Sequence, residues 1–342
     1  MPTIPADKLE SLATRIFVAL GTPEADARGV ATLLVRANLR GHDSHGAIRI
    51  PQYAGAIRTG HVNPKSPITV IAETPVIVRL DGGRGFGQVV ARRGMEMAIG
   101  KAKANGLSAV TLANTTHVGR LADYAEMAAA QGLVGMLCVN AVFGLNVAPW
   151  GGAARRLGTN PHAVAVPGDG GPAMVLDFAT SVVAEGKMRV KKNRKQQAPP
   201  GWFIDAQGRP GTDPEMFYGT PPGSLLTAGE HKGYGLSLAV ELLGGILSGT
   251  GAASAGTGVF ANGTLMICLD VERFIPLPEF RKQVATFFAW VKTAPPVPGG
   301  GEILIPGEPE ARLEAERRRD GIPIEDETWR QIEMLAAELG VG

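Results

Sequence analysis

The sequence contains very little cysteine. Cys138 and Cys268 are the only two in 342 residues, and each lies within an apolar run. This excludes a disulfide framework and a cysteine-ligated metal site, because both need paired or clustered cysteines. We therefore predict two buried thiols and a protein of a reducing compartment.

No charge of one sign predominates, and no long apolar run is present. The 34 basic and 32 acidic residues give a net charge of +2, which offers no argument for nucleic-acid or membrane binding. The longest apolar-looking run, residues 235–247, contains Glu241 and is too short to span a bilayer. The first residues lack a basic segment followed by an apolar one, so we predict no signal peptide and a cytoplasmic protein.

The common nucleotide-binding and hydrolase motifs are also missing. Gly83, Gly85 and Gly87 follow a predicted strand, but their spacing is not G-x-G-x-x-G. The acidic residue that should end a second strand is absent as well. We interpret this segment as a turn and the start of a helix. The sequence has neither an HExxH zinc motif nor a G-x-S-x-G nucleophile elbow.

What the sequence does contain is typical of a globular enzyme. Apolar residues make up 44% and charged residues 19%, and the length allows two domains or one large interrupted domain. The 46 glycines and 25 prolines are spread between periodic segments, which favours glycine-rich turns near ligands over disorder.

The hydrophobic periodicity predicts a mixed α/β chain. Residues 140–167 are dense in turn residues, and we predict a loop there that presents backbone groups to a ligand. The predicted helices cover about 7–20, 22–39, 51–59, 88–104, 121–131, 229–248, 278–292, 311–319 and 325–339, and the strands about 68–71, 76–80, 107–113, 133–140, 174–181 and 264–270.

The segment from residue 40 to 49 concentrates reactive side chains. It holds His42, Asp43, Ser44, His45 and Arg49 between two predicted helices, with a glycine near each end. A polar loop held between packed elements is a common place for a reaction site. The alternative interpretation is a helix C-cap with a histidine near the negative end of the helix. The spacing alone leaves both open.

Three further positions suggest ligand contacts. His117 lies where a predicted strand passes into a helix, which favours a ligand-facing side chain, although loop backbone can also satisfy a histidine. Lys232 lies among glycines at a predicted helix start, which suits an anionic ligand but does not match a Walker motif. Lys191–Lys195 is a basic run, either solvated surface or a clamp for cofactor phosphates.

Together these residues fit hydride transfer to a 2-oxo acid. A histidine, His45 or His117, exchanges a proton near neutral pH, and Arg49 is suited to hold a carboxylate with two hydrogen bonds. A metal-dependent hydrolase or lyase would instead use His42 and His45, without the usual ligand spacing. Acyl transfer through Ser44 is not favoured, because the sequence lacks the G-x-S-x-G nucleophile elbow.

The motifs as a set resemble the malate/L-lactate dehydrogenases of the second, non-Rossmann type. They cover the chain from about residue 7 to 335, and the VVAEGK and HKGYG stretches most resemble the hydroxycarboxylate dehydrogenase B branch. The matching stretches are RGHDSHGAIRIPQY, TTHVGR, VAPWGG, LGTNPHAVAVPG, MVLDFATSVVAEGK, GWFIDAQGRPGTDP, GEHKGYGLSLAVELLGGILSG and ILIPGEPEARLEAERRRDGIP.

The resemblance implies an α/β fold with a largely antiparallel central sheet and a helical domain built from both chain ends. It also implies a homodimer, dependence on NAD or NADP, and a 2-oxo or 2-hydroxy acid as substrate. We expect residues 1–75 to form a helical segment with the catalytic loop. Residues 76–295 would form the cofactor and substrate domain, and residues 296–342 a helical segment packed on the first.

The same resemblance implies roles for individual residues. His45 and His117 match the acid/base histidines, and Ser44 and Arg49 match substrate-binding positions. No protein metal ligand is implied. The residues that match cofactor contacts are Arg120, Asp177, Phe178, Ala179, His231, Lys232, Asn262, Gly307 and Glu308.

Some positions depart from the family pattern. TTHVG replaces the commoner Ser-Asn-His-Phe-Gly, residues 141–146 are unusually apolar, and Glu230 stands where glycine is usual. Because the first two lie near the expected substrate pocket, the alternatives stay open. They are reduction of a cyclic imino acid (piperideine- or pyrroline-2-carboxylate), metal-dependent hydrolysis or lysis, and nucleotide binding without catalysis.

Overall fold

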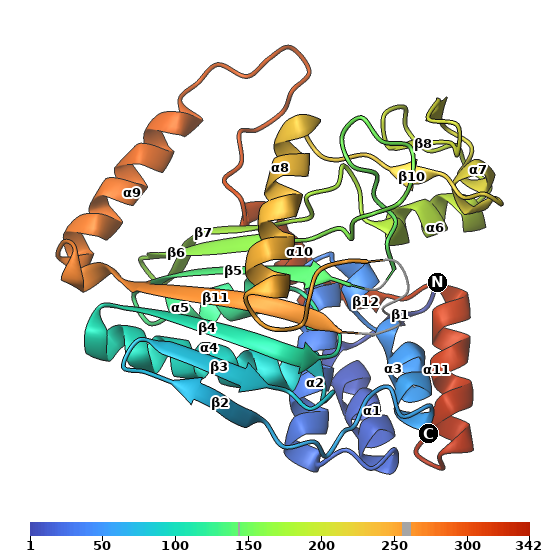
Figure 1. Cartoon of the computed structure of the whole chain (residues 1–342), viewed down its shortest axis with the longest axis horizontal. Coiled ribbons are helices and arrows are strands. Elements are labelled where there is room, and N and C mark those ends of the chain that lie inside the picture. Colours follow the sequence, from blue (N-terminus) through green and yellow to red (C-terminus); the bar gives the residue numbers. More distant parts are fainter. Residues whose placement is uncertain (143, 255–260) are drawn as a thin grey trace.

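The computed structural model describes residues 1–142, 144–254 and 261–342. A seven-stranded sheet crosses the molecule, in the order β2-β3-β4-β11-β5-β6-β7 (Figure 1). Only β3 and β4 run parallel, and every other neighbouring pair is antiparallel, which confirms the predicted sheet. The strands are β2 (Thr69–Glu73), β3 (Ile77–Asp81), β4 (Leu107–Thr115), β5 (Leu133–Ala141), β6 (His162–Gly168), β7 (Gly171–Phe178) and β11 (Asn262–Asp270).

Two helices, α4 (Gly87–Asn105) and α5 (Ala122–Ala129), cover one face of the sheet. Alternate residues of each strand point to that face, as the two-residue period of a strand requires. Gly135 of β5 allows a close approach, because a Cβ there would lie 2.8 Å from the carbonyl oxygen of Ala125. This packing forms the larger core of the molecule.

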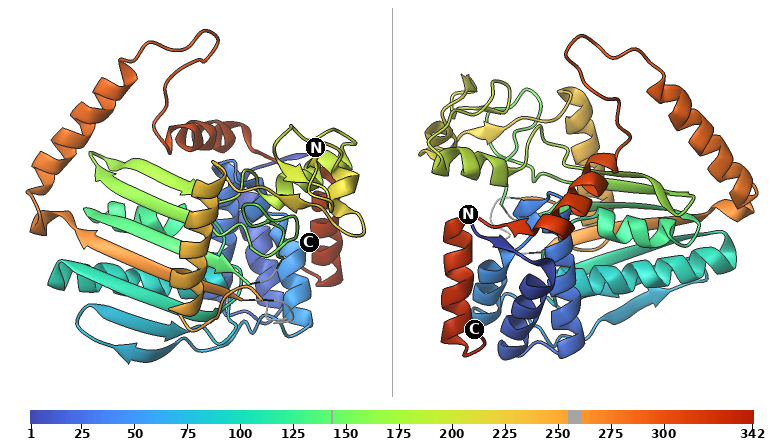
Figure 2. Two further views of the ribbon diagram at one scale, coloured as in Figure 1. Left: turned by 45° about the horizontal axis from the view of Figure 1, so that its top comes forward. Right: turned by 180° about the vertical axis from the view of Figure 1, so that it is seen from behind.

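The opposite face of the sheet is covered only in part. Helix α8 (His231–Val240) continues into a π-helical turn (Glu241–Ile246), and Val240 packs on β5 and β11. Farther along, helix α9 (Leu277–Lys292) buries none of its residues. Figure 2 (left) shows α8 lying across the strands, while α9 and the loop after it extend away from them.

The two chain ends build a separate helical layer, as predicted. Helices α1 (Ala6–Ala19), α2 (Glu24–Leu39) and α3 (Arg49–Arg58) share one hydrophobic core with α11 (Asp326–Glu338). The short strand β1 (Thr3–Ile4) pairs with β12 (Ile322–Pro323). The right view of Figure 2 shows the red C-terminal helix beside the blue N-terminal ones.

A smaller unit lies beside this layer, at one end of the sheet (Figure 1). It has its own core, which includes Phe203, Phe217 and Leu225. Another helix, α10, follows the long loop after α9. The remaining elements are α6 (Glu185–Asn193), α7 (Pro214–Tyr218), α10 (Glu308–Asp320), β8 (Phe203–Ile204), β9 (Pro210–Gly211), β10 (Ser224–Leu225) and the 3-10 turns at Asp43–His45 and Val271–Arg273.

One predicted loop is wrong in part. The interpretation of residues 140–167 as a loop missed β6, which begins at His162. Its dense turn signals end at Asn160 and Pro161, after which alternate residues are buried between the two neighbouring strands. The apolar stretch 141–146 includes position 143, which lies outside the described residues.

Both cysteines are free and buried, as predicted. Burial raises the pKa of Cys138 to about 11 and that of Cys268 to about 12, so both thiols stay protonated near neutral pH. Among the described residues, no helix is long and apolar enough to cross a bilayer.

Candidate active site

The loop after α2 is held in shape by one buried amide. Asn38 donates from Nδ2 to Asp43 Oδ1 at 2.7 Å, and its Oδ1 accepts from the backbone N–H of Ala47 at 2.7 Å. Gly41 has φ 78°, and the N–H of His42 returns to the carbonyl of Ala37 at 2.8 Å. The loop is therefore a glycine-containing helix C-cap, and the cap also orients the reactive side chains.

His45 and His117 meet face to face, although 72 positions separate them in the sequence. Their ring centroids are 5.3 Å apart and the rings are inclined by 25°. Ser44 Oγ lies 3.0 Å from His45 Nδ1, and Tyr53 Oη lies 2.6 Å from His117 Nδ1. Within the described residues, neither Nε2 has a hydrogen-bond partner, so both are available to a ligand.

Both rings are neutral near neutral pH. Burial lowers the pKa of His45 to about 3 and that of His117 well below its usual value. The positive charge of Arg49 adds to this effect on both rings. Because Arg49 acts on both rings, the three predicted residues form one site.

Tyr53 and Gln88 belong to the site, although neither was predicted from the sequence. Gln88 Nε2 donates to Tyr53 Oη at 2.7 Å, which leaves the phenol proton free for His117 Nδ1. Burial raises the pKa of Tyr53 to about 12, so the phenol keeps that proton. One signal was present, because Tyr53 lies four residues after Arg49 and therefore shares its face of α3.

Arg49 is aimed by two hydrogen bonds of its own. Its Nε donates to the carbonyl oxygen of Ser44 at 2.7 Å, and its Nη1 donates to Gln52 Oε1 at 2.6 Å. The remaining nitrogen, Nη2, has no hydrogen-bond partner in the part of the chain that the structure describes. A carboxylate bound there would lie beside the two histidines.

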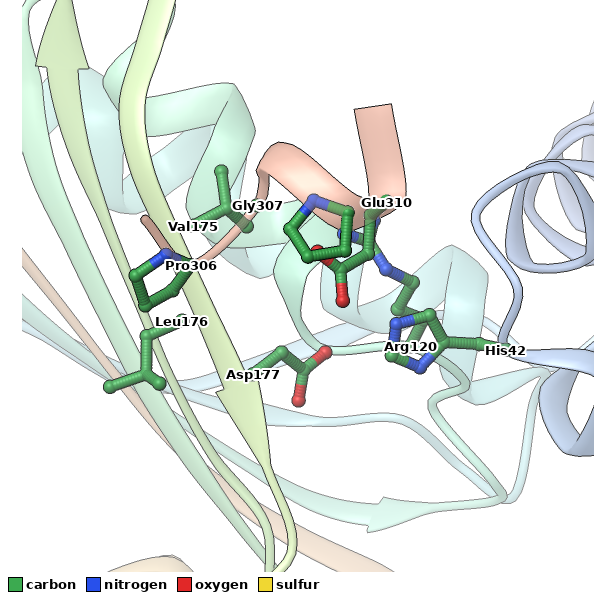
Figure 3. A pocket seen from close by; sticks show the side chains of 9 residues that line it. His42, Arg120, Val175, Leu176, Asp177, Pro306, Gly307 and Glu310 are labelled. Carbon is green, nitrogen blue, oxygen red and sulfur yellow. The ribbon is translucent and has the colours of Figure 1, made fainter. Parts of the chain in front are cut away.

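A pocket of about 110 Å³ lies next to this loop, between the end of β7 and the start of α10 (Figure 3). The side chains of His42, Arg120, Asp177 and Glu310 line it, together with the backbone of Gly307. The volume is below the 300–1,000 Å³ typical of ligand pockets, so it can hold only one part of a dinucleotide.

Asp177 is the best-placed acceptor in this pocket. Its Oδ2 accepts from the backbone N–H of Ala122 at 2.8 Å. Burial raises its pKa to about 6, against the opposing effect of that hydrogen bond and of Arg120. Its carboxylate faces His42 and Arg120 (Figure 3). Burial, followed by the charge of Arg120, lowers the pKa of His42 to about 4.

Both terminal nitrogens of Arg120 are engaged by the protein, while its buried Nε has no hydrogen-bond partner among the described residues. Its Nη1 donates to Asp123 at 2.7 Å and its Nη2 to Glu126 at 2.9 Å, and all three side chains are buried. Arg36 pairs with the same two carboxylates. Arg120 therefore fixes one wall of the pocket, and its charge is already neutralised.

The loop before α10 is pressed against β7. Pro306 accepts a hydrogen bond from the N–H of Val175 at 2.9 Å, and Gly307 has φ 101°. A Cβ at Gly307 would lie 3.1 Å from Val175 Cβ, so only glycine fits there without strain. The Glu308 carboxylate accepts from the N–H of Ile305 at 2.9 Å and pairs with Lys292.

The other predicted cofactor residues are more scattered. Phe178 and Ala179 follow Asp177 at the end of β7. His231 and Lys232 are exposed in the first turn of α8 and do not line the pocket of Figure 3. The two polar atoms of the Asn262 side chain bind the protein itself, which suggests an indirect role.

The basic run is mostly paired within the protein. Lys192 pairs with Glu215 at 3.1 Å, and Arg194 pairs with Glu325 at 2.7 Å. Lys191 reaches Gln196 at 3.3 Å. This pattern favours the surface interpretation over a phosphate clamp.

The residues needed by a metal site do not converge. Among the described residues, no group of three His, Cys, Asp or Glu side chains is arranged to hold a metal ion. His42 lines the pocket, whereas His45 stacks on His117. The arrangement instead fits acid/base chemistry on a carboxylate-bearing substrate. The carboxylate of Asp177 and the bare backbone at Gly307 fit a sugar hydroxyl of a nucleotide.

Comparison with known proteins agrees with a site for acid/base chemistry on a carboxylate-bearing substrate. Residues 4–333 match the malate/L-lactate dehydrogenase family. Hydroxycarboxylate dehydrogenase B of Escherichia coli (strain K12) is 38% identical, with 98% of this chain and 94% of that protein covered. Malate dehydrogenase of Pyrococcus horikoshii is 39% identical, with 99% and 96% covered.

Solved structures show the same likeness. The chain superposes on malate dehydrogenase from Pyrococcus horikoshii OT3 with a TM-score of 0.91, at 36% identity, and covers 96% of it. Delta1-piperideine-2-carboxylate reductase from Pseudomonas syringae gives a TM-score of 0.85 at 28% identity. That alignment covers 98% of this chain and all of the reductase. The chain is therefore an enzyme of the malate/L-lactate dehydrogenase family.

Proposed function

We propose that this enzyme interconverts a 2-oxo acid and a 2-hydroxy acid with a nicotinamide nucleotide. The observation that carries the proposal is the stacked pair His45 and His117, together with the charge of Arg49 that acts on both rings. Neither Nε2 has a hydrogen-bond partner in the described part of the chain. Relatives named as hydroxycarboxylate, malate, L-lactate and L-sulfolactate dehydrogenases support it.

In the reaction, Arg49 holds the substrate carboxylate through its unpartnered Nη2. This places the substrate's C2 oxygen beside the two imidazoles, which exchange the proton that reduction adds and oxidation removes. Ser44 and Tyr53 orient the rings through their Nδ1 atoms. The hydride would come from, or pass to, a nicotinamide nucleotide when one is bound. Partial burial of the histidines limits water around the reacting carbon.

The test is an absorbance assay of NADH and NADPH, run separately with pyruvate, oxaloacetate, phenylpyruvate, glyoxylate and piperideine-2-carboxylate. We expect oxidation of the nucleotide with at least one of the oxo acids. Turnover of the cyclic imine alone would instead place the enzyme with the reductases of imino acids. Nucleotide binding without turnover of any compound would contradict the proposal and favour a non-catalytic nucleotide-binding protein.

The choice of nucleotide follows from the charge of the pocket, and we propose NAD. Asp177 and Glu310 both line it, and a carboxylate accepts a hydrogen bond from a ribose hydroxyl but repels a phosphate. The basic run that might have bound a 2′-phosphate is largely paired. The exposed Lys232 remains the candidate for the pyrophosphate, since it lies in the first turn of α8. In the same assay, NADPH should be clearly poorer than NADH.

We also propose that the enzyme is a homodimer. One sheet face carries apolar residues that stay half-buried within the described part of the chain: Val134, Met136, Val164, Val166, Met174 and Leu176. Helix α9 beside it exposes Phe287 and Trp290, at 55% and 69%, and the π-helical turn after α8 exposes Leu242 and Ile246. Apolar patches of this extent mark interaction sites. A second copy supplies the same patches, so a two-fold pairing can cover both.

A further inference from the structure

A buried carboxylate lies outside the histidine site and outside the pocket of Figure 3. Glu241 begins the π-helical turn after α8 and is only 4% exposed. Its Oε1 accepts from Asn160 Nδ2 at 2.8 Å. Its Oε2 accepts from Asn140 Nδ2 at 3.2 Å and from the backbone N–H of Ala253 at 2.9 Å. All three partners are N–H donors, and no cation pairs with it among the described residues.

One branch of this network reaches the loop that carries His117. Asn140 accepts from Gly263 N–H through Oδ1, and its backbone carbonyl accepts from Asn262 Nδ2, both at 2.9 Å. Asn262 Oδ1 in turn accepts from the N–H of Val118 at 3.2 Å. Val118 directly follows His117 in the chain. Three buried side chains thus connect the π-turn with the residue next to a catalytic histidine.

The other branch reaches the ends of β5 and β7. Asn160 Oδ1 accepts from the N–H of Ala141, the last residue of β5, at 3.2 Å. The carbonyl of the preceding residue, Thr159, accepts from the N–H and the hydroxyl of Thr180, at 2.9 and 3.0 Å. Thr180 follows Ala179, one of the predicted cofactor positions. Glu241 therefore joins the His117 loop to the strand end beside the cofactor pocket.

The π-turn is shaped to hold this network. A Cβ at Gly245 would lie 2.3 Å from Asn140 Nδ2, and one at Gly244 would lie 3.1 Å from the backbone nitrogen of Asn140. The backbone of the turn therefore presses directly on Asn140. Single π-turns within helices are rare and are frequently found at functional sites.

We propose that Glu241 is a positioning residue that acts on His117 through Asn140 and Asn262. The inference rests on the proposed function. The position of Glu241 requires a carboxylate, because both side-chain oxygens accept hydrogen bonds from N–H donors. A glutamine offers only one acceptor and two donors, so its NH₂ group would face a donor in either orientation. Glu241→Gln keeps the size of the side chain and breaks at least one branch.

The experiment compares full-length Glu241→Gln with Glu333→Gln, which removes a charge from the exposed face of α11. We expect Glu241→Gln to lower kcat by roughly 10- to 100-fold, because a small displacement of a catalytic group is costly. The KM for the oxo acid should change much less, since Arg49 lies outside the network. Glu333→Gln should match the wild-type enzyme.

A second readout does not depend on turnover. Hydrogen exchange followed by mass spectrometry should show faster exchange in residues 114–121 of Glu241→Gln, with unchanged exchange in α1. This holds whether or not any compound in the substrate panel reacts, so failure of the proposed function remains distinguishable. Unchanged exchange in residues 114–121 would overturn the inference, and so would faster exchange across the whole chain or equal losses in kcat and nucleotide affinity.

Discussion

At the scale of single residues, the proposed reaction site rests on two histidines, each oriented by a hydroxyl group. His45 and His117 each use Nδ1 to contact a hydroxyl, and each keeps Nε2 available. This division is typical of acid/base histidines, since the bond at one nitrogen orients the ring and sets the proton on the other.

Removing one of the two histidines should affect turnover far more than folding. We expect His45→Ala to lower kcat by roughly 10²- to 10⁴-fold, the usual contribution of a positioned acid or base. The midpoint of thermal unfolding should change little, because the ring is only half-buried. His61→Ala is the matched control, since His61 is exposed and lies outside the site. Near-normal turnover of His45→Ala would remove that residue from the mechanism.

Acid should destabilise the folded enzyme through its buried, neutral histidines. Burial lowers the pKa of His45 to about 3 and that of His42 to about 4, so between those values and 6.5 the unfolded chain binds more protons. Stability therefore falls as the pH decreases below 6.5, by about 2 kcal/mol per histidine at pH 5. Asp177 opposes this by about 1 kcal/mol, because its raised pKa of about 6 favours protonation in the folded state.

Urea unfolding at pH 7.5 and pH 5 measures this difference. His42→Asn should still fold. Its unfolding free energy should fall by one histidine's contribution less between pH 7.5 and pH 5 than that of the wild-type enzyme. An unfolding free energy that is equal at the two pH values would contradict the assignment of neutral, buried histidines.

At the scale of elements, the turn between α2 and α3 decides where the reactive side chains point. Gly46 lies against the amide of Asn38, and a Cβ there would approach Oδ1 to 2.1 Å. Gly55, in the middle of α3, has nothing within 4 Å of the corresponding position. A side chain is therefore excluded at Gly46 but has free space at Gly55, nine residues farther along the chain.

The pair Gly46→Ala and Gly55→Ala tests this requirement. We expect Gly46→Ala to displace Asn38 and lower kcat by at least about 10-fold, with a loss of stability of roughly 1–3 kcal/mol. Gly55→Ala should instead stabilise the protein by about 0.5–1 kcal/mol, since alanine loses less backbone entropy in a helix. Calorimetry and steady-state kinetics distinguish the two, and a fully active Gly46→Ala would show that the loop tolerates the shift.

At the scale of the whole molecule, the partly covered sheet face and α9 leave apolar side chains exposed to solvent. A sheet that is apolar on both faces needs a covering layer on each. Among the described residues, α4 and α5 cover one side, whereas α8 and the π-helical turn after it cover part of the other. The cytoplasmic location remains a prediction from the sequence.

Weakening the exposed face of α9 tests the proposed dimer. Trp290 and Phe287 are exposed and stack with ring centroids 6.3 Å apart. We expect the double variant Phe287→Ser/Trp290→Ser to shift the light-scattering mass from two chains toward one. Arg330→Ser, on the far helix α11, is the control. A monomeric wild-type enzyme at micromolar concentration would contradict the dimer directly.

Much of the fold could be predicted because local patterns specify it. The apolar pattern predicts α2 to within two residues at its start, and it predicts both ends of β3 and β5 to within one residue. β6 was missed because turn residues precede it and its strand signal is short. The division of the chain at residues 75 and 295 stays a prediction.

The sequence by itself determined which residues are the candidates for the chemistry. His45, Arg49 and His117 stand in short polar motifs whose residue types already suggest a proton exchange and a carboxylate anchor. Only the tertiary structure decided how they act together. The stacking of His45 on His117, the Gln88–Tyr53 chain behind it and the burial of Glu241 all join distant segments. Local patterns hold no information on such contacts, because packing of the helical layer against the sheet creates them.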